Sequence, residues 1–115
     1  MTLMEAITKI DAQKHNTCSL SEKIGWVSQL DAMACKLLFP GRAFTPYGED
    51  TPTDTPLQIP APFDEVYLYW LEGKIDYLNG EFSRFNNANA MFASAWERFS
   101  AYVLRATPKP GVGNR

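Results

Sequence analysis

The feature that most constrains the fold is a row of large apolar residues in the C-terminal half of the chain. Its members recur at alternating steps of three and four residues over five heptads, the spacing of one helix face that packs against another helix. This heptad row consists of Leu68, Leu71, Ile75, Leu78, Phe82, Phe85, Asn89, Phe92, Trp96, Phe99 and Val103. We therefore expect an all-α protein whose largest element is a helix over residues 63–105.

Gly80 stands inside the heptad row, and Asn79-Gly80 is a dipeptide typical of chain reversals. A helical hairpin usually needs about two to five connecting residues, whereas Leu78 and Phe82 keep their heptad positions on both sides of this glycine. We favour one long helix, bent or weakened near Gly80. At about 1.5 Å per residue it would be about 65 Å long, so part of its apolar face would need a neighbouring copy to cover it. A break at Gly80 would instead permit a compact bundle.

Two shorter helices are expected before this one. Thr2 and Glu5 have the spacing of a capping box, and so have Ser19 and Glu22. Apolar residues at helical spacing follow each box, which predicts helices over residues 3–13 and 20–38.

Six of the eight prolines fall within residues 39–62, which excludes a regular helix there. A segment of this length is either a functional arm or a loop packed through Phe44, Tyr47, Leu57 and Ile59. Its "PLQIP" stretch is suited to lie extended against another strand or chain.

The chain of 115 residues, 45% of them apolar, has the size of one domain. We expect a single helical domain over residues 1–107, including the Pro-rich segment, and a flexible, mildly basic tail over residues 108–115. This tail is either an inert end or a docking peptide.

The net charge of -2 provides no overall field that would attract the protein to nucleic acid or to an anionic membrane. No apolar segment with a cleavage signal follows Met1, and no apolar run is long enough to span a bilayer. The cytoplasm of the producing cell is the expected place of synthesis.

No set of residues has the pattern of an active site. The acidic residues Asp64, Glu65, Glu72, Asp76 and Glu81 have no histidine near them and are expected to form a solvated face. His15 is expected at the surface and Cys35 in the core, and these residues with Cys18 lack the spacing of a zinc site. The glycines match no nucleotide-binding motif. We therefore expect no catalytic residues, no metal and no cofactor.

The asparagines of "SRFNNANAMF" divide into two groups. Asn89 holds a position in the heptad row, whereas Asn86 and Asn87 point to flanking faces. A single amide in an apolar row is best known for fixing register or partner number between helices. The candidate oligomer interface is accordingly Phe85, Asn89, Phe92, Trp96 and Phe99.

Three stretches together resemble one known family: "TLMEAITKID", "EKIGWVSQLD" and "DTPLQIPAPFDEVYLYWLEGKIDYLNGEFSRFNNANAMFASAWERF". They are similar to small proteins encoded between the major capsid and tail genes of tailed phages and prophages of Gram-positive bacteria, known as head-tail connector or head-completion proteins. The resemblance covers residue 2 to about residue 105, and residues 39–53 are its least typical part.

The resemblance implies an all-helical adaptor without catalytic residues that assembles as a ring of twelve copies beneath the portal at the capsid vertex of the virion. Such a ring extends the DNA channel toward a downstream tail protein, with DNA only as passing cargo. In similar connectors C-terminal segments dock into the portal, which makes Lys109 and Arg115 portal-docking candidates. A slightly acidic protein suits a channel that must not hold DNA, and Glu72 and Asp76 are candidates to face it.

The residues alone leave a second hypothesis open, a helical protein–protein interaction module or small dimeric regulator that pairs through the heptad row. Gene neighbourhood separates the two, since portal and capsid genes upstream favour the connector.

Overall fold

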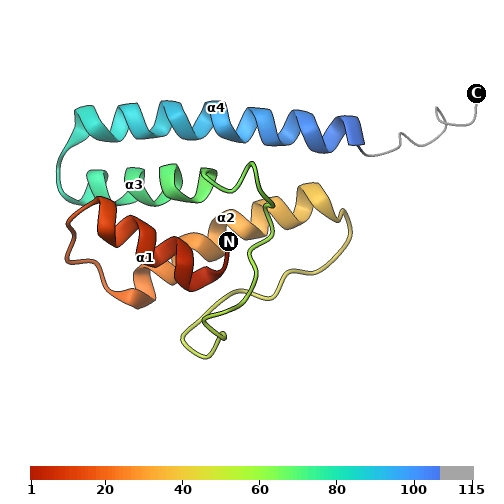
Figure 1. The fold of residues 1–115 in the computed structure, drawn as a ribbon, viewed down its shortest axis with the longest axis horizontal. Helices are drawn as coiled ribbons and strands as arrows, with labels where there is room; N and C mark the ends of the chain where they lie inside the picture. The colour runs from red at the N-terminus through yellow and green to blue at the C-terminus, as the bar shows by residue number, and fades with distance from the viewer. Residues whose placement is uncertain (107–115) are drawn as a thin grey trace, which may run out of the picture.

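The computed structural model describes residues 1–106 as an all-α fold. Its four helices are α1 (Leu3–Gln13), α2 (Leu20–Leu38), α3 (Val66–Leu78) and α4 (Phe82–Ala106). Within this range the only β-type pairing is an isolated bridge between Thr2 and Pro56. In Figure 1, α3 lies between α4 on one side and α1 and α2 on the other. The expected all-α class is confirmed.

Both predicted capping boxes are present. The Thr2 hydroxyl accepts from the Glu5 backbone N–H at 3.2 Å, and the Glu5 carboxylate accepts from the Thr2 backbone N–H at 2.8 Å. Ser19 and Glu22 exchange the same two bonds at 3.0 and 3.1 Å. Each box satisfies two backbone donors that a helix start would otherwise leave free, so α1 and α2 begin at the residues that the sequence indicates.

The expected continuous helix over residues 63–105 is wrong, because the chain reverses at Gly80 (Figure 1). Gly80 has φ of 72°, a left-handed conformation that a glycine adopts without a Cβ clash. Its N–H donates to the Tyr77 carbonyl at 3.1 Å, and the Glu81 N–H donates to the Asp76 carbonyl at 2.9 Å. These two bonds are a Schellman motif, which ends α3 and allows α4 to return along it.

The Pro-rich segment contains no helix and packs on the rest of the molecule. The Leu3 N–H donates to the Thr55 carbonyl at 2.9 Å, and the Leu57 N–H donates to the Met1 carbonyl at 3.0 Å. The "PLQIP" stretch therefore runs beside the N-terminal residues of its own chain. Leu57 and Ile59 are buried, so this part of the segment belongs to the core.

A single apolar core joins the four helices and the Pro-rich segment. Its fully buried members come from every element and include Leu3, Ile10, Val27, Leu30, Ile59, Leu71, Ile75 and Phe99. The heptad row thus buries much of its apolar area by folding back on itself and on α2, not only by pairing with another copy.

Candidate functional site

The surface of greatest functional interest lies on the α3–α4 hairpin. At its centre the two helices approach closely through small residues, since a Cβ added to Gly73 would lie 3.8 Å from the Ala88 Cβ. Ala88 and Ala95 are buried between the helices. Because these contacts use small side chains, four large aromatic residues of the hairpin remain partly exposed beside them: Trp70, Phe85, Phe92 and Trp96.

The five interface candidates have different locations. Phe99 is 0% exposed and packs 5.8 Å from the Phe63 ring and 5.7 Å from the Trp96 ring, measured between centroids. Phe99 is therefore a core residue of the protomer, contrary to the expectation that it lies at an interface. Phe85, Phe92 and Trp96 are half-buried.

Asn89 is exposed, and the buried position on this turn of α4 belongs to Ala88. Within residues 1–106 the Asn89 side chain makes no hydrogen bond. Asn86 and Asn87 are exposed as well, so the three amides do not form one cluster. The amide of Asn89 is thus available at the surface and does not face α3 from inside the hairpin.

Asn89 stands at the rim of an aromatic groove between the two helices of the hairpin. Its walls are Trp70, Gly73 and Lys74 of α3 and Phe85, Asn89 and Phe92 of α4. A second hollow adjoins it and shares two of its residues; it is lined by Trp26, Lys74, Tyr77, Leu78 and Phe85. We refer to the two hollows together as the Lys74 groove.

The groove is held in shape by contacts among its aromatic rings. The Trp70 and Phe92 ring centroids lie 5.0 Å apart, and the Trp70 indole N–H donates to the Trp26 carbonyl at 2.8 Å. The Lys74 ammonium lies 4.4 Å from the centroid of the Trp70 ring, a cation–π distance. The groove therefore combines a fixed aromatic wall with one positive charge.

The tip of the hairpin exposes more apolar surface. Tyr77, Leu78 and Phe82 are 58%, 55% and 58% exposed, although Leu78 and Phe82 belong to the heptad row. The Tyr77 ring lies 5.9 Å from the Phe82 ring and 5.4 Å from the Phe85 ring. Reversal at Gly80 places these residues at the end of the hairpin, where no other helix of residues 1–106 covers them.

A buried carboxyl group on α2 is the main polar feature that the sequence did not reveal. Asp31 is 0% exposed and accepts from the Tyr67 hydroxyl at 2.5 Å, the Tyr47 hydroxyl at 2.6 Å and the Gln58 N–H at 3.1 Å. The Tyr67 hydroxyl in turn accepts from the Ile59 N–H at 2.8 Å. This network fastens the Pro-rich segment to α2 and α3.

Burial shifts the titration of this network. It raises the pKa of the Asp31 carboxyl above its usual value, because burial outweighs the opposing hydrogen bonds from Tyr47, Tyr67 and Gln58. It also raises the pKa of the Tyr47 and Tyr67 hydroxyls, and the neighbouring Asp31 adds to the effect. Both tyrosines therefore remain hydrogen-bond donors. A sequence signal existed, since Asp31 lies on the same helical stripe as Ile24, Val27 and Ala34.

The expectation that Asp76 forms part of a solvated or channel-facing surface is wrong. Asp76 is 0% exposed, and its Oδ1 accepts from the Lys14 ammonium at 2.5 Å. Its Oδ2 is buried and has no hydrogen-bond partner among residues 1–106. Glu72 is half-buried. The Lys14–Asp76 pair joins the end of α1 to the end of α3 and therefore has a structural role.

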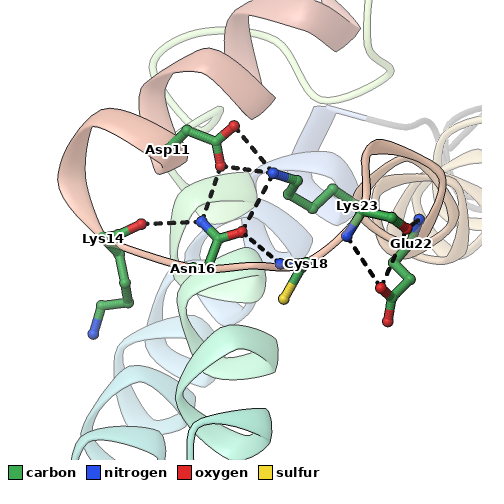
Figure 2. A network of polar contacts seen from close by, with 7 residues as sticks. Asp11, Lys14, Asn16, Cys18, Glu22 and Lys23 are labelled. Carbon is green, nitrogen blue, oxygen red and sulfur yellow. Dashed lines mark hydrogen bonds and ion pairs between the residues drawn. The ribbon is translucent and has the colours of Figure 1, made fainter.

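A further network closes the link between α1 and α2 (Figure 2). The Lys23 side chain is 8% exposed, and its ammonium lies 2.9 Å from an Asp11 carboxylate oxygen. The Asn16 side-chain amide donates to the same carboxylate at 3.0 Å. Burial opposes the charge on Asp11, but the bonds from Asn16 and Lys23 prevail and lower the pKa of its carboxyl. The Oδ1 of the Asn16 side chain accepts from the Cys18 N–H at 3.2 Å.

The remaining candidates for chemistry lie apart from the groove. Cys35 is buried in α2, Cys18 is half-buried, and His15 is exposed. Burial raises the pKa of the Cys18 thiol. Among residues 1–106 no group of three or more His, Cys, Asp or Glu side chains is arranged to hold a metal ion. In the same range no helix is both long and apolar enough to cross a membrane.

Comparison with known proteins gives no assignment, because no family model, no curated protein and no solved structure matches the chain. The portal-docking candidates Lys109 and Arg115 lie outside the described residues, as does the tail over residues 108–115.

Proposed function

We propose that this protein is a structural virion protein of the phage neck, one component of a head-tail connector. Copies of the chain form a ring that docks under the portal and extends the DNA channel toward the tail. The proposal rests on the resemblance of the three quoted stretches, and one structural observation supports it: the α3–α4 hairpin exposes a continuous apolar and aromatic surface.

Much of that surface is not buried within the protomer. Tyr77, Leu78 and Phe82 are more than half exposed at the tip, and the Lys74 groove continues from them along the hairpin. Exposed apolar area of this kind is typical of surfaces that associate with other proteins. A subunit of a ring that also contacts a portal needs several such surfaces on one small domain.

The second candidate, a helical interaction module or small dimeric regulator, uses the same hairpin surface in another way. A regulator would pair two hairpins across a two-fold axis and stop at a dimer. A connector subunit presents different surfaces to its two neighbours and closes into a ring.

The test is to mix the purified protein with the portal protein encoded by the same phage or prophage and to image the mixture by electron microscopy. We expect a ring of additional density on one face of the portal, with the helical hairpins arranged about its axis. A matched variant, Tyr77→Ser/Leu78→Gln/Phe82→Ser, changes only residues that are more than half exposed, so it is expected to keep the fold and to weaken assembly. Portal particles that show no additional density after mixing with the native protein would contradict the connector. The absence of a portal gene from the neighbourhood of this protein's gene would contradict it as well. Either result would favour the regulator.

A further inference from the structure

The Lys74 groove has the chemistry of a peptide-binding site. Its walls are aromatic rings, and its charge is the single ammonium of Lys74 stacked on Trp70. Grooves lined by aromatic rings bind proline-containing segments, because the apolar proline rings pack on the aromatic faces and proline restricts the backbone before binding. The rings are held by their own contacts before any ligand arrives, which lowers the entropy lost on binding.

Lys74 makes no ion pair with any carboxylate of residues 1–106, although four other cationic side chains in this range, and the N-terminus, do. No acidic residue lines either hollow of the groove. The groove therefore favours a ligand that brings its own carboxylate together with apolar rings.

One segment of this chain has that combination. Residues 46–52, "PYGEDTP", place Glu49 and Asp50 between Pro46 and Pro52, and all four of these residues are exposed. Neither Glu49 nor Asp50 forms an ion pair within residues 1–106. We call residues 46–52 the acidic turn.

The acidic turn is already folded in the free protomer. The Thr51 N–H donates to the Gly48 carbonyl at 3.0 Å, and the Gly48 N–H donates to the Thr51 hydroxyl at 2.8 Å. Its base is fastened to α2, since the Tyr47 N–H donates to the Ser28 hydroxyl at 2.9 Å and the Tyr47 hydroxyl to Asp31. A fixed turn presents its two carboxylates at little entropic cost.

The turn and the groove of one molecule lie on different sides. In Figure 1 the middle of the Pro-rich segment (yellow-green), which contains the acidic turn, extends beyond α1 and α2, on the side of the molecule away from α4. The groove lies on the other side of α1 and α2, because α4 forms one of its walls. A contact between an acidic turn and a Lys74 groove therefore joins two copies of the chain.

We propose that the acidic turn of one copy binds in the Lys74 groove of the next copy, with Glu49 and Asp50 facing the Lys74 ammonium and Pro46 and Pro52 packed on the aromatic rings. Because the two surfaces differ, the contact is head-to-tail and generates a closed ring or an open filament, not a two-fold dimer. The inference rests on the proposed function in one respect, since it names the contact between neighbouring subunits of the ring.

The test is a charge exchange measured by sedimentation velocity of the purified protein over a range of concentrations at low salt. We expect the native protein to associate beyond a dimer. Lys74→Glu and the pair Glu49→Lys/Asp50→Lys are each expected to weaken association by about tenfold or more, because each places like charges opposite one another. A one-to-one mixture of the two variants, and a chain that carries all three changes, are expected to regain association, since every junction then joins opposite charges.

Two variants serve as controls. Lys36→Glu and Glu97→Lys reverse exposed charges elsewhere on α2 and α4, and both are expected to leave association unchanged. Thermal unfolding of every variant shows whether the fold is retained. A native protein that stays monomeric at hundreds of micromolar overturns the inference. So does a result in which neither charge reversal weakens association, or in which combining the two reversals does not restore it.

These outcomes are distinct from failure of the proposed function. Ring density on the portal together with charge-exchange variants that assemble normally would retain the connector and reject this contact. Restored association of the exchanged pair without any portal binding would retain the contact and reject the connector.

Discussion

The two ends of α3 differ in how the chain treats its polar and apolar groups. At its start, Tyr67 joins a network in which the Asp31 carboxyl group meets three donors and the Pro-rich segment is fastened down. At its end, Tyr77 and Leu78 each expose more than half of their surface to solvent, as does Phe82 of α4. The difference indicates that the first region specifies the fold, whereas the second is free to contact other molecules.

The largest effect is expected from Asp31→Ala in the buried network. The change removes the acceptor of three hydrogen bonds, those from the Tyr47 hydroxyl, the Tyr67 hydroxyl and the Gln58 N–H. We expect a loss of about 4 kcal/mol in the free energy of unfolding, measured in urea, since bonds to a charged group contribute about 1.5–3 kcal/mol each and partial rehydration offsets some of the loss. Asp54→Ala, an exposed position on the same segment, is the control and should change stability by less than about 0.5 kcal/mol. Equal losses in the two variants would mean that the network does not hold the segment.

The Lys14–Asp76 pair is expected to come next. Lys14→Met leaves the fully buried Asp76 carboxylate without its partner, which costs about 3 kcal/mol. The double variant Lys14→Met/Asp76→Leu removes both charges and should recover most of this loss, because apolar groups often replace a buried ion pair without cost. Urea unfolding of both variants measures the difference. A double variant as unstable as the single one would show that the charges themselves are needed.

A smaller effect is expected at the turn that creates the exposed end. Gly80→Ala places a Cβ at φ of 72°, which costs about 1–2 kcal/mol. Gly25→Ala lies within α2, where an added Cβ meets nothing within 4 Å, and it should be neutral or stabilising. If Gly80→Ala forms larger assemblies while losing stability, the chain has an alternative continuous helix. Sedimentation velocity measures the assembly size of the two variants, and thermal unfolding measures their stability.

The pH dependence of stability is expected to have opposite signs for the carboxyl groups of Asp31 and Asp11. Because the folded state raises the pKa of Asp31, protonation favours the folded state, and the contribution of Asp31 to stability falls as pH rises from about 3.8 through the raised value. The folded state lowers the pKa of Asp11, so the contribution of Asp11 is lost as pH falls below about 3.8. Unfolding free energies of Asp31→Asn and Asp11→Asn relative to the native protein, measured from pH 3 to pH 7, should therefore change with pH in opposite directions. Parallel changes would contradict the difference in environment.

The smallest effect on stability is expected at the hairpin tip. Phe82→Ser removes a ring that is 58% exposed, so the free energy of unfolding should change by less than about 0.5 kcal/mol. Phe99→Ala removes the fully buried ring of the same heptad row and should cost about 4 kcal/mol. Sedimentation at high concentration should show weaker association for Phe82→Ser. A large stability loss in that variant would mean that the tip belongs to the core.

The local signals in the sequence predicted local structure well. Thr2 with Glu5 and Ser19 with Glu22 fix the starts of α1 and α2, because a capping box needs only neighbouring residues. The prolines excluded a helix between α2 and α3 for the same reason, since each acts on its own backbone. Gly80 was ambiguous, because its heptad spacing is the same whether the helix continues or folds back.

The candidate site was predicted only in part. Phe85, Phe92 and Trp96 were recognised as large groups on one helix face, and they do lie along the groove or beside it. The location of Asn89 at the surface, of Phe99 in the core and of Lys74 at the centre of the groove depends on how closely α3 and α4 approach through Gly73 and Ala88. No spacing rule gives that distance.

The sequence by itself determined the helical class, the starts of the first two helices and the Pro-rich interruption, because hydrogen bonds and backbone angles within a few residues decide them. Only the tertiary structure decided that the heptad row closes on itself, that Asp31 and Asp76 are buried and that the hairpin tip remains exposed. These features depend on contacts between residues far apart in the chain, where the burial of one side chain is set by the volume of another.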